Sequence, residues 1–291
     1  MWNSWIIGSL LLLAGLLSGC GVVRLAYAQG PDLAYWWLDA YADFNDLQTP
    51  RVRNVLGEWF RWHRASQLPD YAQFLARAQV LAAEPVTPAQ VCRLYDEAMV
   101  RVDTLLERAL PAAVETVQSL TPAQITHIEH KYGKVNIKFR DDYLQSDPQT
   151  RLEASIERAV DRAEMAYGSL NDAQRQLLAR GIAASPFDPQ LWLSERVLRQ
   201  QEALTTLRRL SAERATADQT LAALRALVHH VRHSPREDYL AYRQRLYEFN
   251  CNLAAQLHNS TTREQRQAAV KKLKSWEEDA RVLAADAPTA P

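Results

Sequence analysis

The sequence predicts an all-α protein, built as an elongated or bundle-like array of amphipathic helices. Beyond residue 30 the only glycines are Gly57, Gly133, Gly168 and Gly181, whereas a fold of strands needs many more turn glycines. Apolar residues recur with the helical period through most of the chain. The segment 134–139 (KVNIKF) is the one place where a short strand is an alternative to helix.

Residues 1–19 have the features of a signal peptide. The apolar run from Trp5 to Leu17 is too short to cross a bilayer as a helix, and it leads into Leu17-Ser18-Gly19-Cys20. This ending resembles the lipobox of bacterial lipoproteins. The resemblance implies cleavage before Cys20, a diacylglycerol on its sulfur and an acyl group on the new amine. Because Gly21 follows rather than an aspartate, it further implies the periplasmic face of the outer membrane. The alternative is a buried first helix with a chance cysteine.

The rest of the chain divides into four segments. Residues 20–30 are predicted to be the lipidated cysteine and a short tether, which reaches at most about 40 Å when extended. The folded part would therefore stay close to the bilayer. We expect an N-terminal, membrane-proximal helical layer over 31–119, longer helices over 120–286, and a disordered tail at 287–291.

Capping sequences mark the helix starts. Thr87 and Thr121 each precede Pro-Ala-Gln, so the hydroxyl can accept from a free helix N–H while the glutamine reaches back to the cap. The same logic applies to NDAQ (171–174), TADQ (216–219), SPRE (234–237) and TREQ (262–265). The predicted helices are 32–46, 50–66, 70–83, 88–108, 111–119, 122–144, 148–167, 172–184, 189–213, 217–232, 235–258 and 262–285.

Two of these starts, LTPAQ (Leu120–Gln124) and LNDAQ (Leu170–Gln174), are similar to the LTxxQ motif of small periplasmic chaperones of the envelope stress response. In that family, which is all-helical and cradle-shaped, the motif opens a helix. The resemblance implies ATP-independent holding of unfolded clients. Plain helix capping, with a leucine before the cap, explains the same residues, and we favour it.

Two histidine pairs share a helix face: His127 with His130, and His229 with His233. Glu129 lies within the first pair. Zinc takes at least three protein ligands, and the chain has neither H-E-x-x-H nor C-x-x-C. We therefore predict no metal site and interpret these histidines as solvated or cap-associated.

Charge and missing motifs exclude several function classes. The 34 basic and 34 acidic residues balance, so the chain offers no basic field to nucleic acid. It has no Gly-rich phosphate loop, no G-x-S-x-G elbow and no S-x-x-K, and the acid pairs Asp141-Asp142 and Glu277-Glu278 diverge on a helix. We predict no nucleotide, no cofactor, no catalytic residues and no enzyme. A site assembled only by folding stays open as an alternative.

The segment 33–44 is rich in aromatic residues. Leu33, Trp37, Tyr41 and Phe44 fall on one face of the predicted helix, which we interpret as core packing. The alternative is contact with the lipid interface, where tryptophan and tyrosine concentrate, because the tether is short.

With Cys20 lipidated, Cys92 and Cys251 are the remaining cysteines, an even number in an oxidising compartment. A buried free thiol would fit such helices equally well. We nevertheless predict a disulfide that joins the N-terminal layer to the penultimate helix. It requires the two Cα atoms to lie within about 7 Å.

Longer segments of the chain point to a family. They are GPDLAYWWLDAYADF (30–44), TPRVRNVLGEWFRWHR (49–64), SPFDPQLWLSER (185–196) and LHNSTTREQR (257–266). Together with the lipobox they resemble an uncharacterised family of Gram-negative outer-membrane lipoproteins, defined as a domain of unknown function. The resemblance implies no particular activity and no catalytic residues.

We therefore expect a lipid-anchored protein with a non-catalytic binding, scaffolding or assembly role in the cell envelope. Its partners would be the membrane, through Cys20, and an envelope protein. The alternatives are a chaperone-like holdase and an envelope enzyme with a fold-assembled site. A concave apolar groove would favour binding, whereas a polar pocket with converging carboxylates or histidines would favour catalysis.

Overall fold

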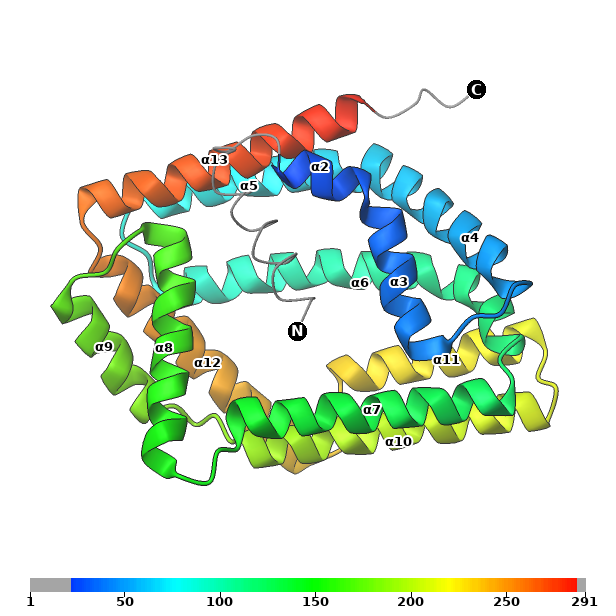
Figure 1. Ribbon diagram of the computed structural model, residues 1–291. Helices are drawn as coiled ribbons and strands as arrows, with labels where there is room; N and C mark the ends of the chain where they lie inside the picture. Colours follow the sequence, from blue (N-terminus) through cyan, green and yellow to red (C-terminus); the bar gives the residue numbers. More distant parts are fainter. Residues whose placement is uncertain (1–21, 287–291) are drawn as a thin grey trace, which may run out of the picture.

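The computed structural model describes residues 22–286, which form an all-α fold with no strand in that range (Figure 1). The predicted signal peptide, Cys20 and the tail at 287–291 lie outside the described residues. The helices are α2 (Val22–Ala28), α3 (Gly30–Ala42), α4 (Gln48–Trp62), the π-helix η1 (His63–Gln67), α5 (Leu68–Ala83), α6 (Pro88–Gln118), α7 (Pro122–Tyr143), α8 (Pro148–Tyr167), α9 (Asp172–Ala183), α10 (Pro189–Ala212), α11 (Ala217–Arg232), α12 (Glu237–Asn259) and α13 (Arg263–Ala285).

Long helices form opposite edges of the molecule. In Figure 1, α5 and α13 run along the upper edge and α7 and α10 along the lower edge, while α3 and α8 cross between them. Behind these lies α6, which packs against α11 and α12. Because α5 pairs with α13 and α6 with α11 and α12, the predicted regions 31–119 and 120–286 interlock in one body.

Two local expectations are corrected by the structure. The segment 134–139 is helical within α7, because Asn136 and Phe139 are buried one turn apart and contact α10 through Gln200 and Trp192. The strand alternative is therefore wrong. Pro111 does not end a helix either: α6 runs through it, and the residues buried on either side of the proline include Leu110 and Val114.

The π-helix replaces a break that we predicted between 66 and 70. It places His63 in an aromatic cluster, stacked on Trp59 and edge-on to Tyr71. Burial lowers the pKa of His63 to about 4, so the ring is neutral at neutral pH. Its Nδ1 lies 2.7 Å from the hydroxyl of Tyr27.

The segment predicted as an extended tether is largely helical. Within α2, Arg24 Nε lies 2.8 Å from Asp279 Oδ1 on α13, and the Asp279 side chain is only 2% exposed. The contact between Tyr27 and His63 fixes the other end of α2 to the junction of α4 and α5. The described part of the body begins at Val22, two positions after Cys20 in the sequence.

A pair of glutamines joins the N-termini of α4 and α7. Gln124 Nε2 donates to Gln48 Oε1 at 2.7 Å and to the carbonyl of Asp43 at 2.9 Å. In return, Gln48 Nε2 donates to the carbonyl of Ser119 at 2.9 Å. Gln48 also accepts from the backbone N–H of Asn45, and Gln124 from that of its N-cap, Thr121. We call this arrangement a glutamine clasp.

A second glutamine clasp joins α9 and α13 in the same way. Gln174 Nε2 donates to Gln265 Oε1 at 2.7 Å and to the carbonyl of Ser260 at 3.0 Å, while Gln265 Nε2 donates to the carbonyl of Ser169 at 2.8 Å. Each of the two LTxxQ-like segments thus belongs to a different clasp. Their glutamines have a structural role that goes beyond capping, because each satisfies backbone groups of another helix.

A disulfide joins α6 to α12. The Cα atoms of Cys92 and Cys251 are 5.4 Å apart, inside the limit required for a bridge. It links the predicted N-terminal layer to the penultimate helix.

Candidate functional site

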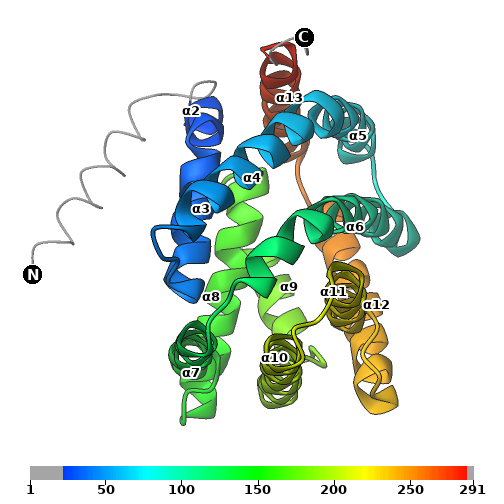
Figure 2. The same ribbon diagram turned by 90° about the vertical axis from the view of Figure 1, so that its right-hand side faces the viewer.

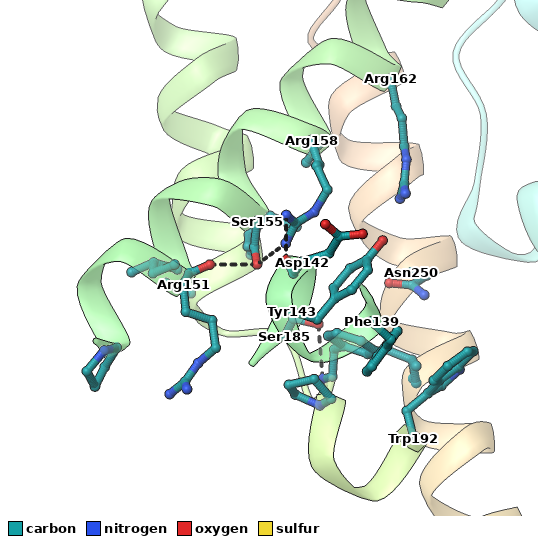
Figure 3. Close-up of a pocket in the computed structure, with 18 of the residues that line it drawn as sticks. Phe139, Asp142, Tyr143, Arg151, Ser155, Arg158, Arg162, Ser185, Trp192 and Asn250 are labelled. Atoms are coloured by element: carbon teal, nitrogen blue, oxygen red, sulfur yellow. Dashed lines mark hydrogen bonds between the residues drawn. The ribbon is translucent and has the colours of Figure 1, made fainter. Parts of the chain in front are cut away.

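A cavity of about 830 Å³ lies between α7, α8, α10 and α12, a volume within the range of small-molecule sites (Figure 3). Its wall also includes the end of α9 and the loop before α10. The residues with polar or aromatic side chains that line it are Lys138, Phe139, Asp142, Tyr143, Arg151, Ser155, Arg158, Arg162, Ser185, Phe187, Trp192, Arg196 and Asn250.

One wall of the cavity is a stack of three aromatic rings. Phe139 and Tyr143 lie one turn apart on α7, so their rings stack with centroids 4.7 Å apart. Trp192 of α10 stacks on Phe139, also at 4.7 Å. Phe187, in the loop before α10, meets Tyr143 edge-on at 6.3 Å. Contacts from two helices and a loop therefore hold this wall in place.

Arginines of α8 also line the cavity, and the guanidinium of Arg158 lies over the Tyr143 ring, 4.4 Å from its centroid. Arg151, Arg158 and Arg162 are seven and four residues apart and so share one helix face. Two of them are fixed by other groups: Arg151 donates to the carbonyl of Gln145 at 2.9 Å, and Arg158 donates to that of Asp142 at 3.0 Å. The third, Arg162, makes no hydrogen bond or ion pair with any described residue, and Figure 3 shows it reaching into the cavity.

Positive charge prevails in the cavity although the chain as a whole is neutral. Lys138 and Arg196 join the three arginines of α8, giving five cationic lining residues. Asp142 is the one carboxylate among the residues that line the cavity, and Lys138 lies 3.1 Å from it. Four cations thus remain without a carboxylate in the lining, which suits an anionic ligand.

Lys138, Asp142 and Tyr143 are among the described lining residues of the cavity, but histidine and cysteine are not, and its single carboxylate has no acidic neighbour there. The cavity is therefore neither the concave apolar groove expected of a binding role nor the polar pocket with converging carboxylates or histidines expected of catalysis. Its polar and aromatic character is instead typical of a binding site for a charged small molecule or headgroup.

The histidines considered as metal ligands lie elsewhere. His127 Nε2 is 3.4 Å from the carbonyl of Ala40, and Glu129 forms an ion pair with Arg208. The rings of His229 and His233 stack at 4.6 Å on α11. Within residues 22–286 no group of three or more histidine, cysteine, aspartate and glutamate side chains is arranged to hold a metal ion.

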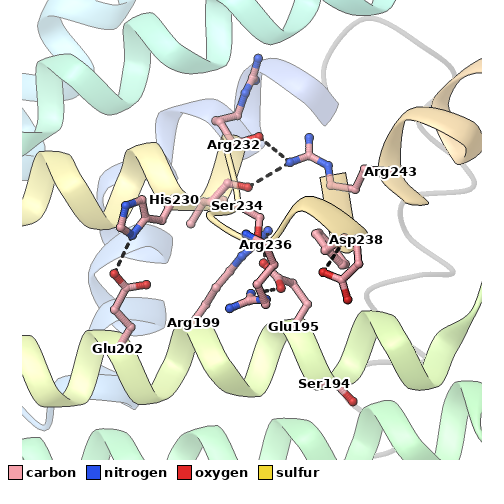
Figure 4. A network of polar contacts seen from close by, with 12 residues as sticks. Ser194, Glu195, Arg199, Glu202, His230, Arg232, Ser234, Arg236, Asp238 and Arg243 are labelled. Atoms are coloured by element: carbon pink, nitrogen blue, oxygen red, sulfur yellow. Dashed lines mark hydrogen bonds and ion pairs between the residues drawn. The ribbon is translucent and has the colours of Figure 1, made fainter. Parts of the chain in front are cut away.

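A buried ion cluster lies on α10 beside the cavity (Figure 4). Glu195 has a side chain that is 2% exposed, and its carboxylate forms ion pairs with Arg199, at 2.7 Å, and with Arg236 in the loop between α11 and α12. Further along α10, Glu202 lies 2.6 Å from His230 of α11. These contacts tie α10 to the connection between α11 and α12, which is a structural role that the sequence did not reveal.

Across the described range, no helix combines the length and apolarity needed to cross a bilayer.

Fold and cavity together define an all-α protein with a basic, aromatic-walled cavity. The chain belongs to DUF6279, a family of unknown function whose model matches residues 40–227. That range includes α7, α8 and α10, which supply most of the cavity wall, but not α12. No curated protein and no solved structure matches the chain. The predicted membership in a family of unknown function is thus confirmed, while lipidation of Cys20 stays a prediction.

Proposed function

We propose that this chain is a lipoprotein, anchored through Cys20 in the outer membrane and facing the periplasm, that binds an anionic ligand without converting it. The apolar run from Trp5 to Leu17 and the sequence Leu17–Cys20 support the anchor. The start of α2 at Val22 is consistent with a body held close to the membrane.

The main support for a binding role is the positive charge of the cavity, which its lining does not neutralise. Arg162 is the most important of these charges, because it has no partner among the described residues. A guanidinium in a concave site gains most when an anion meets its fork of N–H donors, as carboxylates and phosphates do. Arg158 and Arg151 are held by backbone carbonyls, so they present fixed positive charge beside Arg162. Little reorganisation would then be needed when an anion binds.

The aromatic wall narrows the class of ligand further. The stack of Tyr143, Phe139 and Trp192 lines the cavity, with the guanidinium of Arg158 4.4 Å from the Tyr143 ring centroid and that of Arg196 5.5 Å from the Trp192 ring centroid. Such a wall favours a ligand with a ring or an apolar body next to its charge. The chemistry is therefore that of a phosphate or carboxylate attached to a ring-bearing molecule.

Replacing Arg162 by glutamine is expected to weaken binding of phenyl phosphate about three- to tenfold, equivalent to about 1 kcal/mol. Titration calorimetry on the purified protein measures this change. The melting temperature should stay the same, because Arg162 has no described partner to lose. Binding should also weaken as salt is added, since charge attraction is screened.

Arg140→Gln is the matched control for this experiment. Arg140 is exposed on α7, outside the cavity lining, and its removal changes the net charge equally. Phenyl phosphate should bind this variant like the natural chain, and more tightly than inorganic phosphate or benzyl alcohol bind. Equal weakening by Arg140→Gln and Arg162→Gln, or no binding of phenyl phosphate at all, would contradict the proposed site.

The alternatives have less support. The holdase hypothesis rested on the LTxxQ-like segments, and the glutamine clasps account for both of them as packing elements. The hypothesis of a fold-assembled enzyme needs converging acids, bases or nucleophiles, and the lining of the cavity offers one carboxylate paired with a lysine.

A further inference from the structure

The helix α3 carries an apolar stripe on its solvent side. Leu33, Trp36, Trp37 and Ala40 follow the spacing of one helix face, and all four are exposed. The three large side chains have exposed fractions of 50%, 58% and 62%. The prediction that Leu33 and Trp37 pack in the core is therefore wrong.

The opposite face of α3 is the one that packs on the body. Tyr35 is buried there, and its hydroxyl lies 2.9 Å from the Thr49 hydroxyl of α4. Ala42 is buried as well, so α3 carries apolar side chains both on the face that packs on the body and on the face that meets solvent. Two adjacent exposed tryptophans with a leucine on one face are typical of a contact surface.

The position of the anchor indicates what covers this surface. Val22, the first residue of α2, follows Cys20 by two positions. Two residues of chain span at most about 7 Å, so lipidation of Cys20 would keep the start of α2 within that distance of the anchored residue. Helix α2 is itself only seven residues long and leads directly into α3. The contacts of Arg24 with Asp279 and of Tyr27 with His63 fix α2 to the body. The position of α3 relative to the start of α2, where the anchor would attach, is therefore fixed.

The two helices also lie on the same side of the molecule. Figure 2 shows α2 and α3 together, outside α4 and α6. Helix α2 adds exposed Leu25 near the anchor. Tryptophan prefers the boundary between lipid headgroups and acyl chains, where its ring is apolar and its N–H still finds polar partners.

We propose that the stripe of Leu33, Trp36, Trp37 and Ala40 on α3 lies in the headgroup region of the lipid bilayer. The proposal rests on lipidation of Cys20, as given under the proposed function. The acyl chains would supply attachment, and the stripe would fix which side of the protein faces the membrane. An anchored protein without this contact would turn freely about its lipid.

A single-cysteine labelling experiment tests this orientation. Because Cys92 and Cys251 are joined and Cys20 would be lipidated, a cysteine introduced by substitution is the one free thiol. Trp36→Cys places a fluorophore on the stripe, and Val100→Cys, at a 62% exposed position on α6, is the matched control. The processed, lipidated protein is reconstituted in vesicles of phosphatidylethanolamine and phosphatidylglycerol.

Nitroxide-labelled phospholipid is expected to quench the fluorophore at position 36 several-fold more strongly than at position 100, and aqueous iodide should quench it several-fold less. If iodide quenches both positions equally, the stripe faces water and the docking proposal is overturned. Protection from both quenchers together with crosslinking between thiols at position 36 would show that a second copy covers the stripe, which also overturns it. If the protein isolated from membranes carries no lipid on Cys20, the anchor itself is contradicted, so the two failures are distinguishable.

Discussion

Replacing both Cys92 and Cys251 by alanine is expected to lower the free energy of unfolding by about 3–5 kcal/mol. The disulfide joins residues 159 positions apart and so closes a long loop in the unfolded chain. Without it, the unfolded ensemble gains conformational entropy, and the contact between α6 and α12 must form without a covalent link. Alanine is the suitable replacement because Cys251 is buried and a serine hydroxyl would need a partner there.

Urea unfolding of the natural and double-alanine proteins measures the difference. Reduction of the natural protein should reproduce most of the loss, whereas the same reductant should leave the double variant unchanged. A loss below about 1 kcal/mol by both routes would contradict a stabilising bridge between these helices.

Replacing Glu195 by glutamine is expected to cost about 3 kcal/mol of stability. The substitution keeps the shape of the side chain but removes the one charge that faces both Arg199 and Arg236. Two partly buried guanidinium groups would then lie close together without compensation. The cost falls at the lower end of values for buried pairs because both arginines reach solvent.

Glu202→Gln is the control for this substitution. Glu202 lies on the same helix and contacts His230, but its side chain is 37% exposed, so the loss should stay below about 1 kcal/mol. Denaturant unfolding of the two variants separates a buried charge from an exposed one. Equal, small losses would contradict the stabilising role given to the Glu195 cluster.

Helix starts were predictable from the sequence because capping is local. The caps at Thr87, Thr121, Asn171, Thr216 and Thr262 all occur with the reciprocal glutamine bonds that the sequence indicates. Each involves residues only three positions apart, so its geometry does not depend on the rest of the fold. The cap predicted at Ser234 is wrong, because α12 begins after Arg236 and has no side-chain cap.

The glutamine clasps could not be predicted from the sequence, because they join residues far apart in the chain. Gln124 meets Gln48, and Gln174 meets Gln265, across separations of 76 and 91 residues. One LTxxQ-like segment of each clasp is recognisable from the sequence, but its distant partner is not. The partner segments, ending in Gln48 and Gln265, lack the leucine before the cap. All four clasp segments share one spacing: a backbone carbonyl that accepts from the partner glutamine lies five residues before the segment's own glutamine.

The cavity is harder to predict from the sequence than the helix starts. The spacing of Arg151, Arg158 and Arg162 places three cations on one face of α8, which the predicted helix 148–167 could have revealed. The net charge of zero does not indicate this local excess of positive charge on α8. The aromatic wall needed the pairing of α7 with α10, which no local pattern specifies.

The prediction of core packing for the apolar face of α3 is wrong at Leu33 and Trp37, which are exposed, whereas Phe44 packs against the core. A periodic apolar face indicates that the face avoids water, but it does not say whether protein or lipid covers it.

Intact-mass measurement of the protein isolated from membranes tests the central claim most directly, because the anchor determines the compartment, the docking surface and the ligands available. The account predicts a chain that begins at Cys20 and carries the added mass of a diacylglycerol and one further acyl chain. Replacing Cys20 by serine should abolish this modification. A chain that retains Met1, or one that begins elsewhere without lipid, would contradict the account.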